Sequence, residues 1–332
     1  MSNSYLQSIK ERIFLIKSEE EFDDLALEIF DYQSVHCPIY SQYIDLLGVD
    51  RQSIDNIEKI PFLPIEFFKS TKVYSVAEDP QKIFTSSATS SMVPSKHYVA
   101  DLSIYEESLL KSFTLEYGDP SQYTFLALLP SYLEREGSSL IYMVDRLMGL
   151  SGKSANGFYL YNHSELFETL GKLRDKDEKS ILFGVSFALL DFANEFTCYF
   201  PSLIIIETGG MKGRGRELPR EIIHQRLQNS FGVEKVHSEY GMTELLSQAY
   251  SHGNGLFNTP PWMKILIRDF NNPFKLVQPE EVGGINVIDL ANIGSCSFIE
   301  TQDMGIKTAE DLFKITGRIK NSEMRGCNLL LE

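Results

Sequence analysis

The sequence predicts an α/β fold, in which mostly parallel β-sheets are covered by helices and a small β-rich part follows. Between about residues 120 and 240, apolar runs of strand length alternate with helix-like segments, which is typical of βα units. From about Trp262 onward the pattern changes to short strands joined by turns. The chain has 332 residues, of which 43% are apolar and 23% charged, so a sizeable core is available.

The first 80 or so residues favour helices. Ser18 and Glu21 form a capping box before the helical face that Phe22, Leu25, Ala26, Ile29 and Phe30 mark. The two prolines of KIPFLPIEFFKS, residues 59–70, predict an extended segment on the core. A second capping box, Ser103 and Glu106, predicts a helix whose apolar face holds Tyr105, Leu109, Phe113 and Tyr117.

The remaining elements follow from the alternation of patterns. In chain order the βα part contains YTFLALLP, SSLIYMVDRLM, SILFGV, FALLDFANEF, SLIIIETGG, REIIHQRLQNSFG and KVHSEYG. The β-rich part contains KILIRDF, FKLVQPEEVGGINVIDL and SCSFIETQD. We therefore expect a helical cap at 1–80, an α/β core that binds nucleotide and acyl group at 81–261, and a β-rich subdomain at 262–332.

Charge and cysteine content exclude several classes of protein. The net charge is −15 and no stripe of Lys and Arg occurs, which disfavours a nucleic-acid partner. The sequence shows no secretory signal and no apolar run long enough to cross a membrane, so we expect a cytoplasmic protein. The four cysteines are scattered without a C-x-x-C pair, which argues against a zinc site and a disulfide framework.

A loop rich in hydroxyl groups is the first candidate site. Six of the seven residues from Thr85 to Ser91 are serine or threonine, and Lys96 follows. Hydroxyls and backbone N–H groups can surround a polyphosphate while a lysine adds a point charge. Serine and threonine are also common in ordinary loops, where they bond nearby backbone, so this alternative stays open.

A buried strand that ends in two glycines is the second candidate. The run Ile204–Ile206 leads to Gly209 and Gly210, which would place bare backbone at the carboxyl edge of the sheet, where ligands bind in open α/β folds. A tight turn explains the glycines equally well. It does not explain the cations that follow directly, which are Lys212, Arg214 and Arg216.

The segment HSEYGMTELL is the third candidate. Thr243 and Glu244 follow a predicted strand, and a carboxylate beside a hydroxyl at such an edge can hold Mg²⁺ against phosphate oxygens. Alternatively, Thr243 caps a helix that begins at Glu244. Further on, Asp303 is expected after a strand, where its carboxylate can accept the two hydroxyls of a ribose; an aspartate in a turn is the alternative.

The order and spacing of these motifs resemble the adenylate-forming superfamily, which includes acyl-CoA ligases, luciferases and the adenylation domains of nonribosomal peptide synthetases. The resemblance runs from about Pro61 to the C-terminus, where GRIK and SEMRGC close the series. Within the superfamily, the short length and the segments LLPSYLEREGSSLIYMVDRL, ETGGMKGRGRE and SEMRGC look most like the acyl-protein synthetase family of bacterial bioluminescence operons. The implied fold is the N-terminal domain of an adenylate-forming enzyme, with the mobile C-terminal domain absent.

The resemblance implies a role for each motif. ATP phosphates would be bound by Lys96 with Ser86, Ser87, Thr89, Ser90 and Ser91. The adenine would lie along Gly209 and Gly210, with Tyr240 and Gly241 as its stacking neighbours. Thr243 would touch the α-phosphate and Glu244 would hold Mg²⁺. Asp303 and Arg318 would lie at the ribose, and Lys320 matches the hinge position.

Two departures from the family pattern bear on activity. Ala88 and Ser91 replace the two glycines of the usual phosphate loop, and a Cβ there can strain the loop or keep the phosphate away. The chain also ends at Glu332, before the domain that supplies a catalytic lysine in larger relatives. Loss of one such preorganised charge commonly costs about 10²-fold in rate or more.

By resemblance, a fatty or aryl carboxylic acid attacks the α-phosphorus of MgATP, giving an acyl-adenylate and pyrophosphate. A thiol, of coenzyme A or of a protein cysteine, then takes the acyl group. Cys327 is a candidate acceptor and catalytic residue, although a cysteine is more often a small buried apolar residue. The alternative function is a catalytically impaired homologue that binds nucleotide or an acyl group, or serves as a partner protein.

Overall fold

The computed structural model describes residues 3–86, 93–130, 137–209, 218–309 and 312–319. The chain divides into two compact units, and each is discontinuous in sequence. Unit 1 takes in 1–108, 243–247 and 258–332, and unit 2 takes in 109–242 and 248–257. The division of the sequence at residues 80 and 261 stays a prediction.

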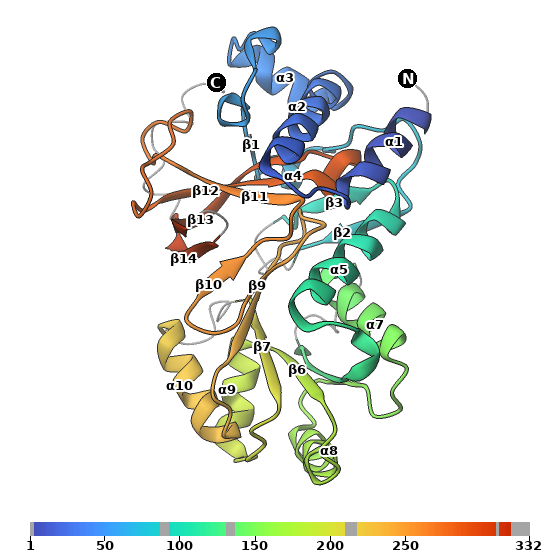
Figure 1. The fold of residues 1–332 in the computed structure, drawn as a ribbon, viewed down its shortest axis with the longest axis vertical. Helices are drawn as coiled ribbons and strands as arrows, with labels where there is room; N and C mark the ends of the chain where they lie inside the picture. The colour runs from blue at the N-terminus through green and yellow to red at the C-terminus, as the bar shows by residue number, and fades with distance from the viewer. Residues whose placement is uncertain (1–2, 87–92, 131–136, 210–217, 310–311, 320–332) are drawn as a thin grey trace. The chain divides into compact units, whose positions relative to one another are not determined.

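Unit 1 begins with helices (Figure 1). They are α1 (Asn3–Ile13), α2 (Glu19–His36), α3 (Pro38–Leu46), α4 (Phe67–Ser70) and the 3-10 helices η1 (Arg51–Ser53) and η2 (Ile57–Lys59). The predicted cap of α2 is confirmed, because Ser18 Oγ accepts the N–H of Glu21 at 3.2 Å. The predicted apolar face of α2 is buried, as expected. Within the segment 59–70, Leu63 and Pro64 form a short strand as predicted, but Lys59 ends η2 and the last four residues form α4.

The sheets of unit 1 include the β-rich part predicted after Trp262. Strands β11 (Met263–Arg268), β12 (Gly283–Asp289), β13 (Phe298–Ala309) and β14 (Leu312–Arg318) are antiparallel neighbours in that order. The short strand β1 (Leu63–Pro64) adds to β13 in parallel. Strands β2 (Lys82–Thr85) and β3 (Lys96–Val99) form a separate antiparallel pair, and the 3-10 helix η4 (Leu290–Gly294) follows β12.

Unit 2 contains the predicted parallel sheet. Its strands are β4 (Thr124–Leu128), β5 (Gly157–Tyr159), β6 (Ser180–Val185), β7 (Ile204–Thr208), β8 (His237–Tyr240), β9 (Ala249–Ser251) and β10 (Leu256–Asn258). The spatial order is β10-β9-β8-β7-β6-β4-β5, and the pairs from β8 to β5 are parallel. Parallel register sets Thr208 beside Glu239, which places the residues after β7 and β8 at one edge of the sheet.

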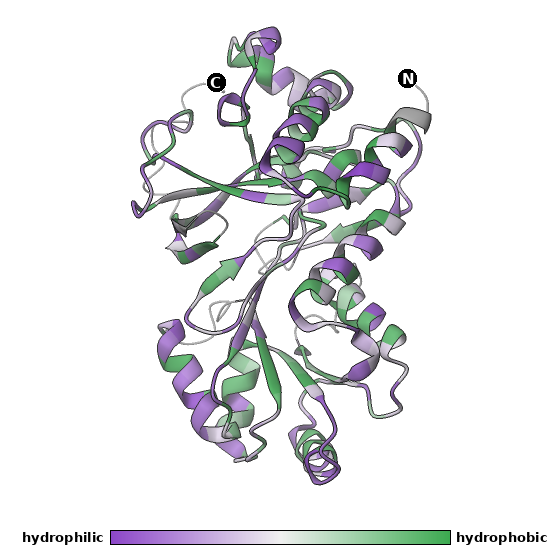
Figure 2. Ribbon diagram, in the orientation of Figure 1, coloured by the Kyte–Doolittle hydropathy of each residue, from purple (hydrophilic) through white to green (hydrophobic). Residues whose placement is uncertain are grey.

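Helices cover this sheet, and strands β4, β6, β8 and β9 are buried along their length. The helices are α7 (Ser139–Ser151), α8 (His163–Asp175), α9 (Ser186–Glu195) and α10 (Arg220–Phe231), with the 3-10 helix η3 (Pro120–Gln122) before β4. Helix α7 contacts β4, and α9 contacts β6, β7 and α10. Figure 2 shows β6 and β7 as hydrophobic and much of α10 as hydrophilic. This is the pattern of a sheet whose two faces are both covered.

Helix α5 (Leu102–Tyr117) corrects one prediction. Ser103 does not cap it, because the helix begins one residue earlier and Asp101 Oδ1 accepts the N–H of Ser103 at 2.9 Å. Asp101 is therefore the N-cap, as the preference for aspartate at that position allows. The predicted apolar face of this helix is buried. Among the described helices, none is long and apolar enough to cross a membrane.

Candidate functional site

Thr243 and Glu244 lie in a turn of unit 1 that follows β8. No helix begins at Glu244, so the alternative that Thr243 caps a helix is wrong. The next three residues, Leu245, Leu246 and Ser247, are buried although they belong to neither helix nor strand. The two residues predicted to bind phosphate and magnesium therefore stand on a buried, irregular segment.

The carboxylate of Glu244 is enclosed by protein, with only 5% of the residue exposed. Burial raises its pKa, while a hydrogen bond from the side chain of Ser95 and the positive charges of Lys69 and Arg318 oppose that rise. Every one of these groups belongs to unit 1. A cation at this carboxylate would favour its ionised form further.

Strands β2 and β3 hold the two ends of the hydroxyl-rich loop together. Thr85 pairs with Lys96, the N–H of Ser86 donates to the Ser95 carbonyl at 3.0 Å, and Ser86 Oγ accepts the N–H of Ser95 at 2.8 Å. Ser95 therefore joins the base of the loop to Glu244. Burial alternates along β3, so the exposed Lys96 lies on the opposite face of the strand from the buried His97.

Asp303 and Arg318 meet on adjacent strands. They are register partners on β13 and β14, and Arg318 Nε donates to Asp303 Oδ1 at 3.0 Å. Asp303 is buried, whereas 79% of the Arg318 side chain is exposed. The expectation that Asp303 follows a strand was wrong, as was its alternative of a turn, because β13 continues to Ala309.

A buried arginine supports the strand that carries Asp303. Arg268 Nη2 donates to the carbonyl of Thr301 at 2.7 Å, and Thr301 Oγ1 accepts the N–H of Asp303 at 3.1 Å. Arg268 also lies 3.4 Å from the carboxylate of Glu300. A Cβ on Gly284 would lie 2.4 Å from the guanidinium carbon of Arg268. The double glycine of β12 and the arginine that ends β11, within the segment KILIRDF, were the sequence signals of this contact.

Gly209 of unit 2 adopts a backbone conformation that favours glycine, with φ of +64°. Its carbonyl accepts a hydrogen bond from Ser186 Oγ at 2.7 Å. The same hydroxyl also lies within hydrogen-bond distance of the carboxylate of the buried Glu207, which precedes the glycine by two residues, so its one proton serves two acceptors. Ser186 begins α9, so this helix fixes the turn after β7. Neither Ser186 nor Glu207 was among the predicted site residues.

Tyr240 is the last residue of β8 in the same unit, and Gly241 follows it. Tyr240 is buried and contacts Phe257 edge to face, with 6.1 Å between the ring centroids. A Cβ on Gly241 would lie 2.3 Å from Glu239 Oε1, so a larger residue at this position would make the carboxylate of Glu239 shift. Burial raises the pKa of Glu239 to about 7, against a hydrogen bond from Thr208. Sequence patterns did not identify Glu239.

The structure brings part of the predicted site together. In unit 1, Ser95 connects Glu244 to the loop base, and the positive charge of Arg318, which pairs with Asp303, acts on the Glu244 carboxylate. In unit 2, Gly209 follows β7 and Gly241 follows β8, at the carboxyl edge of two neighbouring strands of which Tyr240 ends the second. The remaining candidates lie outside the described residues, and these are Ser87, Thr89, Ser90, Ser91, Gly210, Lys320 and Cys327. Their roles stay predictions.

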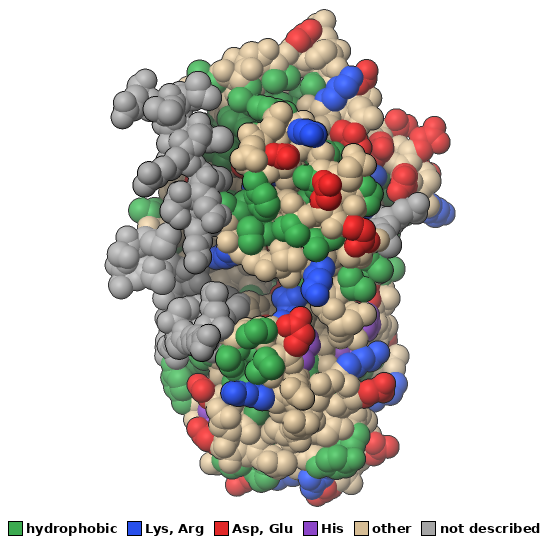
Figure 3. All heavy atoms as spheres, turned by 90° about the vertical axis from the view of Figure 1, so that its left-hand side faces the viewer, with side chains coloured by type: hydrophobic (Ala, Val, Ile, Leu, Met, Phe, Trp, Pro, Cys, Tyr) green, Lys and Arg blue, Asp and Glu red, His purple; other side chains and the backbone are tan. Residues whose placement is uncertain are grey.

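The thiols of the described part of the chain are buried. Cys37, Cys198 and Cys296 are buried free thiols, and burial raises the pKa of each. Within the described ranges, no group of three or more His, Cys, Asp and Glu side chains is arranged to hold a metal. Figure 3 shows acidic and basic side chains intermingled over the face that it presents.

Comparisons with known proteins identify solved structures that are similar to this chain. No model of a known protein family matches the chain, and no curated protein matches it. An open conformation of 2-hydroxyisobutyryl-CoA ligase with 2-HIB-AMP and CoA has a TM-score of 0.65 at 13% identity, over 92% of this chain and 72% of the ligase. The postadenylation state of that ligase with R3-HIB-AMP has a TM-score of 0.68 at 12% identity, over 93% of this chain and 70% of the ligase. ATP-bound MatB from Rhodopseudomonas palustris has a TM-score of 0.55 at 14% identity, over 71% of this chain and 47% of MatB.

These similarities concern the fold, because every identity is below 15%. Both ligases belong to the group whose arrangement the motifs predicted, so the predicted adenylate-forming fold is confirmed. The more specific resemblance to acyl-protein synthetases stays a prediction. The chain shares the fold of adenylate-forming acyl-CoA ligases.

Proposed function

We propose that the protein uses MgATP to activate a carboxylic acid as an acyl-adenylate. The observation that carries the proposal is the gathering of Glu244, the base of the hydroxyl-rich loop and the Asp303–Arg318 pair within unit 1. These groups come from three regions that are far apart in the sequence. They match in type and order the groups that hold magnesium, phosphates and ribose in this fold.

The available oxygen donors fit Mg²⁺. Magnesium prefers oxygen ligands, keeps several of its waters and is commonly held by one or two carboxylates together with substrate phosphates. One buried carboxylate, that of Glu244, meets that requirement without a larger cluster of protein ligands among the described residues, and Thr243 precedes it in the sequence. When bound, the ion would neutralise charge on the triphosphate.

The side chains then divide the binding of ATP among them. Ser86 and Ser95 close the base of the loop that would surround the β- and γ-phosphates. Asp303 would accept hydrogen bonds from the ribose hydroxyls, and Arg318 would add positive charge beside them. The role of Gly209 and Tyr240 at the adenine stays a prediction from the sequence. Such a site works by position and charge, and it needs little covalent participation by the protein.

The reaction balances without another reagent. A carboxylate oxygen of the acid forms a bond to the α-phosphorus, the bond from that phosphorus to the bridging oxygen breaks, and pyrophosphate leaves. We propose a fatty or aryl acid as substrate and a thiol, of coenzyme A or a protein cysteine, as the later acyl acceptor. Cys327 remains the candidate thiol within the chain.

A second candidate function rests on the phosphate loop. Ala88 and Ser91 replace the glycines that this loop usually has, which favours a homologue that binds nucleotide or acyl group with impaired catalysis. Retention of Glu244, Asp303 and Arg318 favours the enzyme.

Exchange of labelled pyrophosphate into ATP, measured with fatty, aryl and amino acids, tests the proposal. The enzyme predicts exchange that depends on one class of acid and is lost in Glu244→Ala. Glu58→Ala removes an exposed carboxylate of the same unit and should leave exchange unchanged. ATP binding without exchange for any acid would support the impaired homologue. Absence of both would overturn the proposed site.

A further inference from the structure

The turn that carries Thr243 and Glu244 needs partners for its backbone. Residues 245–247 are buried and form no helix or strand, so regular secondary structure does not satisfy their N–H and C=O groups. A buried peptide group without a partner costs about as much as a lost hydrogen bond, and such groups are nearly always paired. The partners of this turn are three buried side chains from other elements of unit 1.

His97 holds the first carbonyl. Its Nδ1 lies 2.9 Å from the carbonyl oxygen of Thr243. Since a carbonyl can only accept, Nδ1 must carry the proton, and this fixes the tautomer of the ring. The residue is fully buried, with its ring edge to face against Phe68 at 5.9 Å. His97 stands on β3, two residues after Ser95 at the base of the hydroxyl-rich loop.

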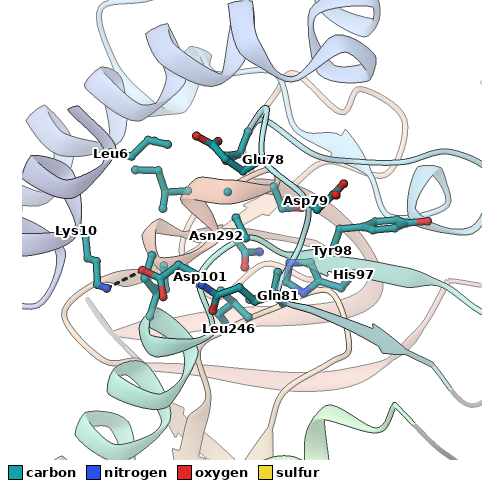
Figure 4. A pocket seen from close by; sticks show the side chains of 18 of the residues that line it. Leu6, Lys10, Glu78, Asp79, Gln81, His97, Tyr98, Asp101, Leu246 and Asn292 are labelled. Carbon is teal, nitrogen blue, oxygen red and sulfur yellow. Dashed lines mark hydrogen bonds and ion pairs between the residues drawn. The ribbon is translucent and has the colours of Figure 1, made fainter. Parts of the chain in front are cut away.

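Asn292 holds the second carbonyl. Its Nδ2 donates to the carbonyl oxygen of Glu244 at 2.8 Å and reaches the Cys296 carbonyl at 3.3 Å. It is fully buried in η4. Figure 4 shows His97 and Asn292 close together at the wall of a cavity of about 350 Å³, which both line.

Asp289 fixes the next part of the turn. Its Oδ2 accepts the N–H groups of Leu246 at 2.8 Å and of Ser247 at 3.0 Å, while Oδ1 accepts Ser247 Oγ at 2.6 Å. The carboxylate is fully buried at the end of β12. The turn is thereby held on both sides of Leu245, by its carbonyls before that residue and by its N–H groups after it.

We propose that His97 and Asn292 are positioning residues for the magnesium ligand. This inference rests on the proposed function. They donate hydrogen bonds to two consecutive carbonyls, those of Thr243 and Glu244, from two separate elements, β3 and η4. Two fixed peptide planes set the direction in which the Glu244 side chain leaves the backbone. The carboxylate is then held toward Ser95 before any ligand arrives.

When either hydrogen bond is removed, we expect the Glu244 carboxylate to be less well preorganised for binding magnesium. A ligand held within a fraction of an ångström of its working position gives much of its effect through geometry, and small displacements can cost about 10²-fold. Neither side chain would touch the nucleotide. Their removal should therefore weaken magnesium-dependent steps while the protein still folds.

The test compares His97→Leu and Asn292→Leu with two further variants. His97→Asn keeps an N–H donor close to the place of Nδ1 and should restore much of what His97→Leu loses. Ser75→Ala is the matched control, because the buried Ser75 Oγ donates to the Ile293 carbonyl at 2.7 Å without touching the turn. It removes the same type of bond one residue from Asn292.

Calorimetry of ATP binding with and without Mg²⁺ supplies the first measurement, and pyrophosphate exchange at varied Mg²⁺ the second. In the two Leu variants we expect the gain in ATP affinity from Mg²⁺ to fall about tenfold, with a matching rise in the Mg²⁺ concentration needed for exchange. Ser75→Ala should lower only the melting temperature. Should one Leu variant fail to fold, the other still measures the effect.

Two results would overturn the inference while leaving the proposed function intact. One is a magnesium dependence in both Leu variants that equals that of Ser75→Ala. The other is a His97→Asn variant as impaired as His97→Leu. A wild-type protein that neither binds MgATP nor exchanges pyrophosphate would instead overturn the proposed function, and this inference with it.

Discussion

Arg318 and Asp303 face each other across β13 and β14 as register partners, with 3.0 Å between Nε and Oδ1. The aspartate is largely covered while the arginine side chain is mostly exposed. An ion pair with one partner in water contributes about 0–1 kcal/mol to stability. We therefore expect the pair to contribute little to stability, which agrees with its proposed role in binding a ligand.

Asp303→Asn tests this interpretation. The amide keeps the shape of the side chain but loses the charge and half of its acceptor capacity, so it binds two ribose hydroxyls less well. We expect ATP affinity to fall about tenfold, as for loss of a charged hydrogen bond, and the melting temperature to change little. Calorimetric titration with ATP and thermal unfolding measure the two effects. Unchanged ATP affinity would remove Asp303 from the site.

Gly284→Ala tests the support beneath Asp303. The new methyl group would lie 2.4 Å from the guanidinium carbon of the buried Arg268, so the arginine or the strand must shift. Overpacking of this kind costs about 1–3 kcal/mol, and we expect a loss near 2 kcal/mol in unfolding free energy.

Gly171→Ala is the control for that change. Gly171 lies in α8, where a Cβ would meet nothing within 4 Å. Alanine is the better helix former, so a gain of up to about 1 kcal/mol is expected. Equal effects of the two substitutions in urea unfolding would mean that Arg268 does not need the space.

Glu239 predicts a pH dependence of stability. Its pKa is about 7 in the folded protein against 4.5 for an ordinary glutamate, because burial penalises the charge. Between these values the folded state binds more protons than the unfolded state, so the free energy of unfolding falls as pH rises from about 4.5 to 7. Above pH 7 the loss is complete, and it amounts to at most about 3 kcal/mol.

Glu239→Gln isolates this effect. Glutamine does not ionise, and its carbonyl oxygen can still accept the hydrogen bond that Thr208 gives to the glutamate. We expect the variant to gain stability relative to the wild type as pH rises from 5 to 8, since other titrating groups are common to both proteins. Parallel profiles of melting temperature against pH would show that the pKa of Glu239 is not raised.

Restoring glycine at two loop positions tests the impaired alternative. Ala88→Gly with Ser91→Gly removes both Cβ atoms that distinguish this loop from the family pattern, so pyrophosphate exchange should rise. A Thr114→Ala variant, with a substitution at an exposed position of α5, serves as a control for changes in exchange that do not come from the loop. Lower or unchanged exchange in the double-glycine variant would mean that the loop is not strained.

Local sequence patterns were sufficient to predict most of the helices and strands. Alternation of apolar runs predicted β4, β6, β7 and β8 with their helices, because periodicity records which face of each element is buried. Errors arose where a neighbouring polar group decided the outcome. Asp101 capped α5 in place of Ser103, and side chains distant in the sequence held the turn at Glu244 without a helix.

By itself the sequence determined the α/β class, the order of the motifs and the candidate residues Glu244, Asp303 and Arg318, because these depend on short segments. Only the tertiary structure decided what surrounds them. His97 reaches Thr243 across 146 positions, and Asn292 reaches Glu244 across 48. Such partners leave no local pattern, because a hydrogen bond between distant segments exists only once the strands and helices that carry them have packed together.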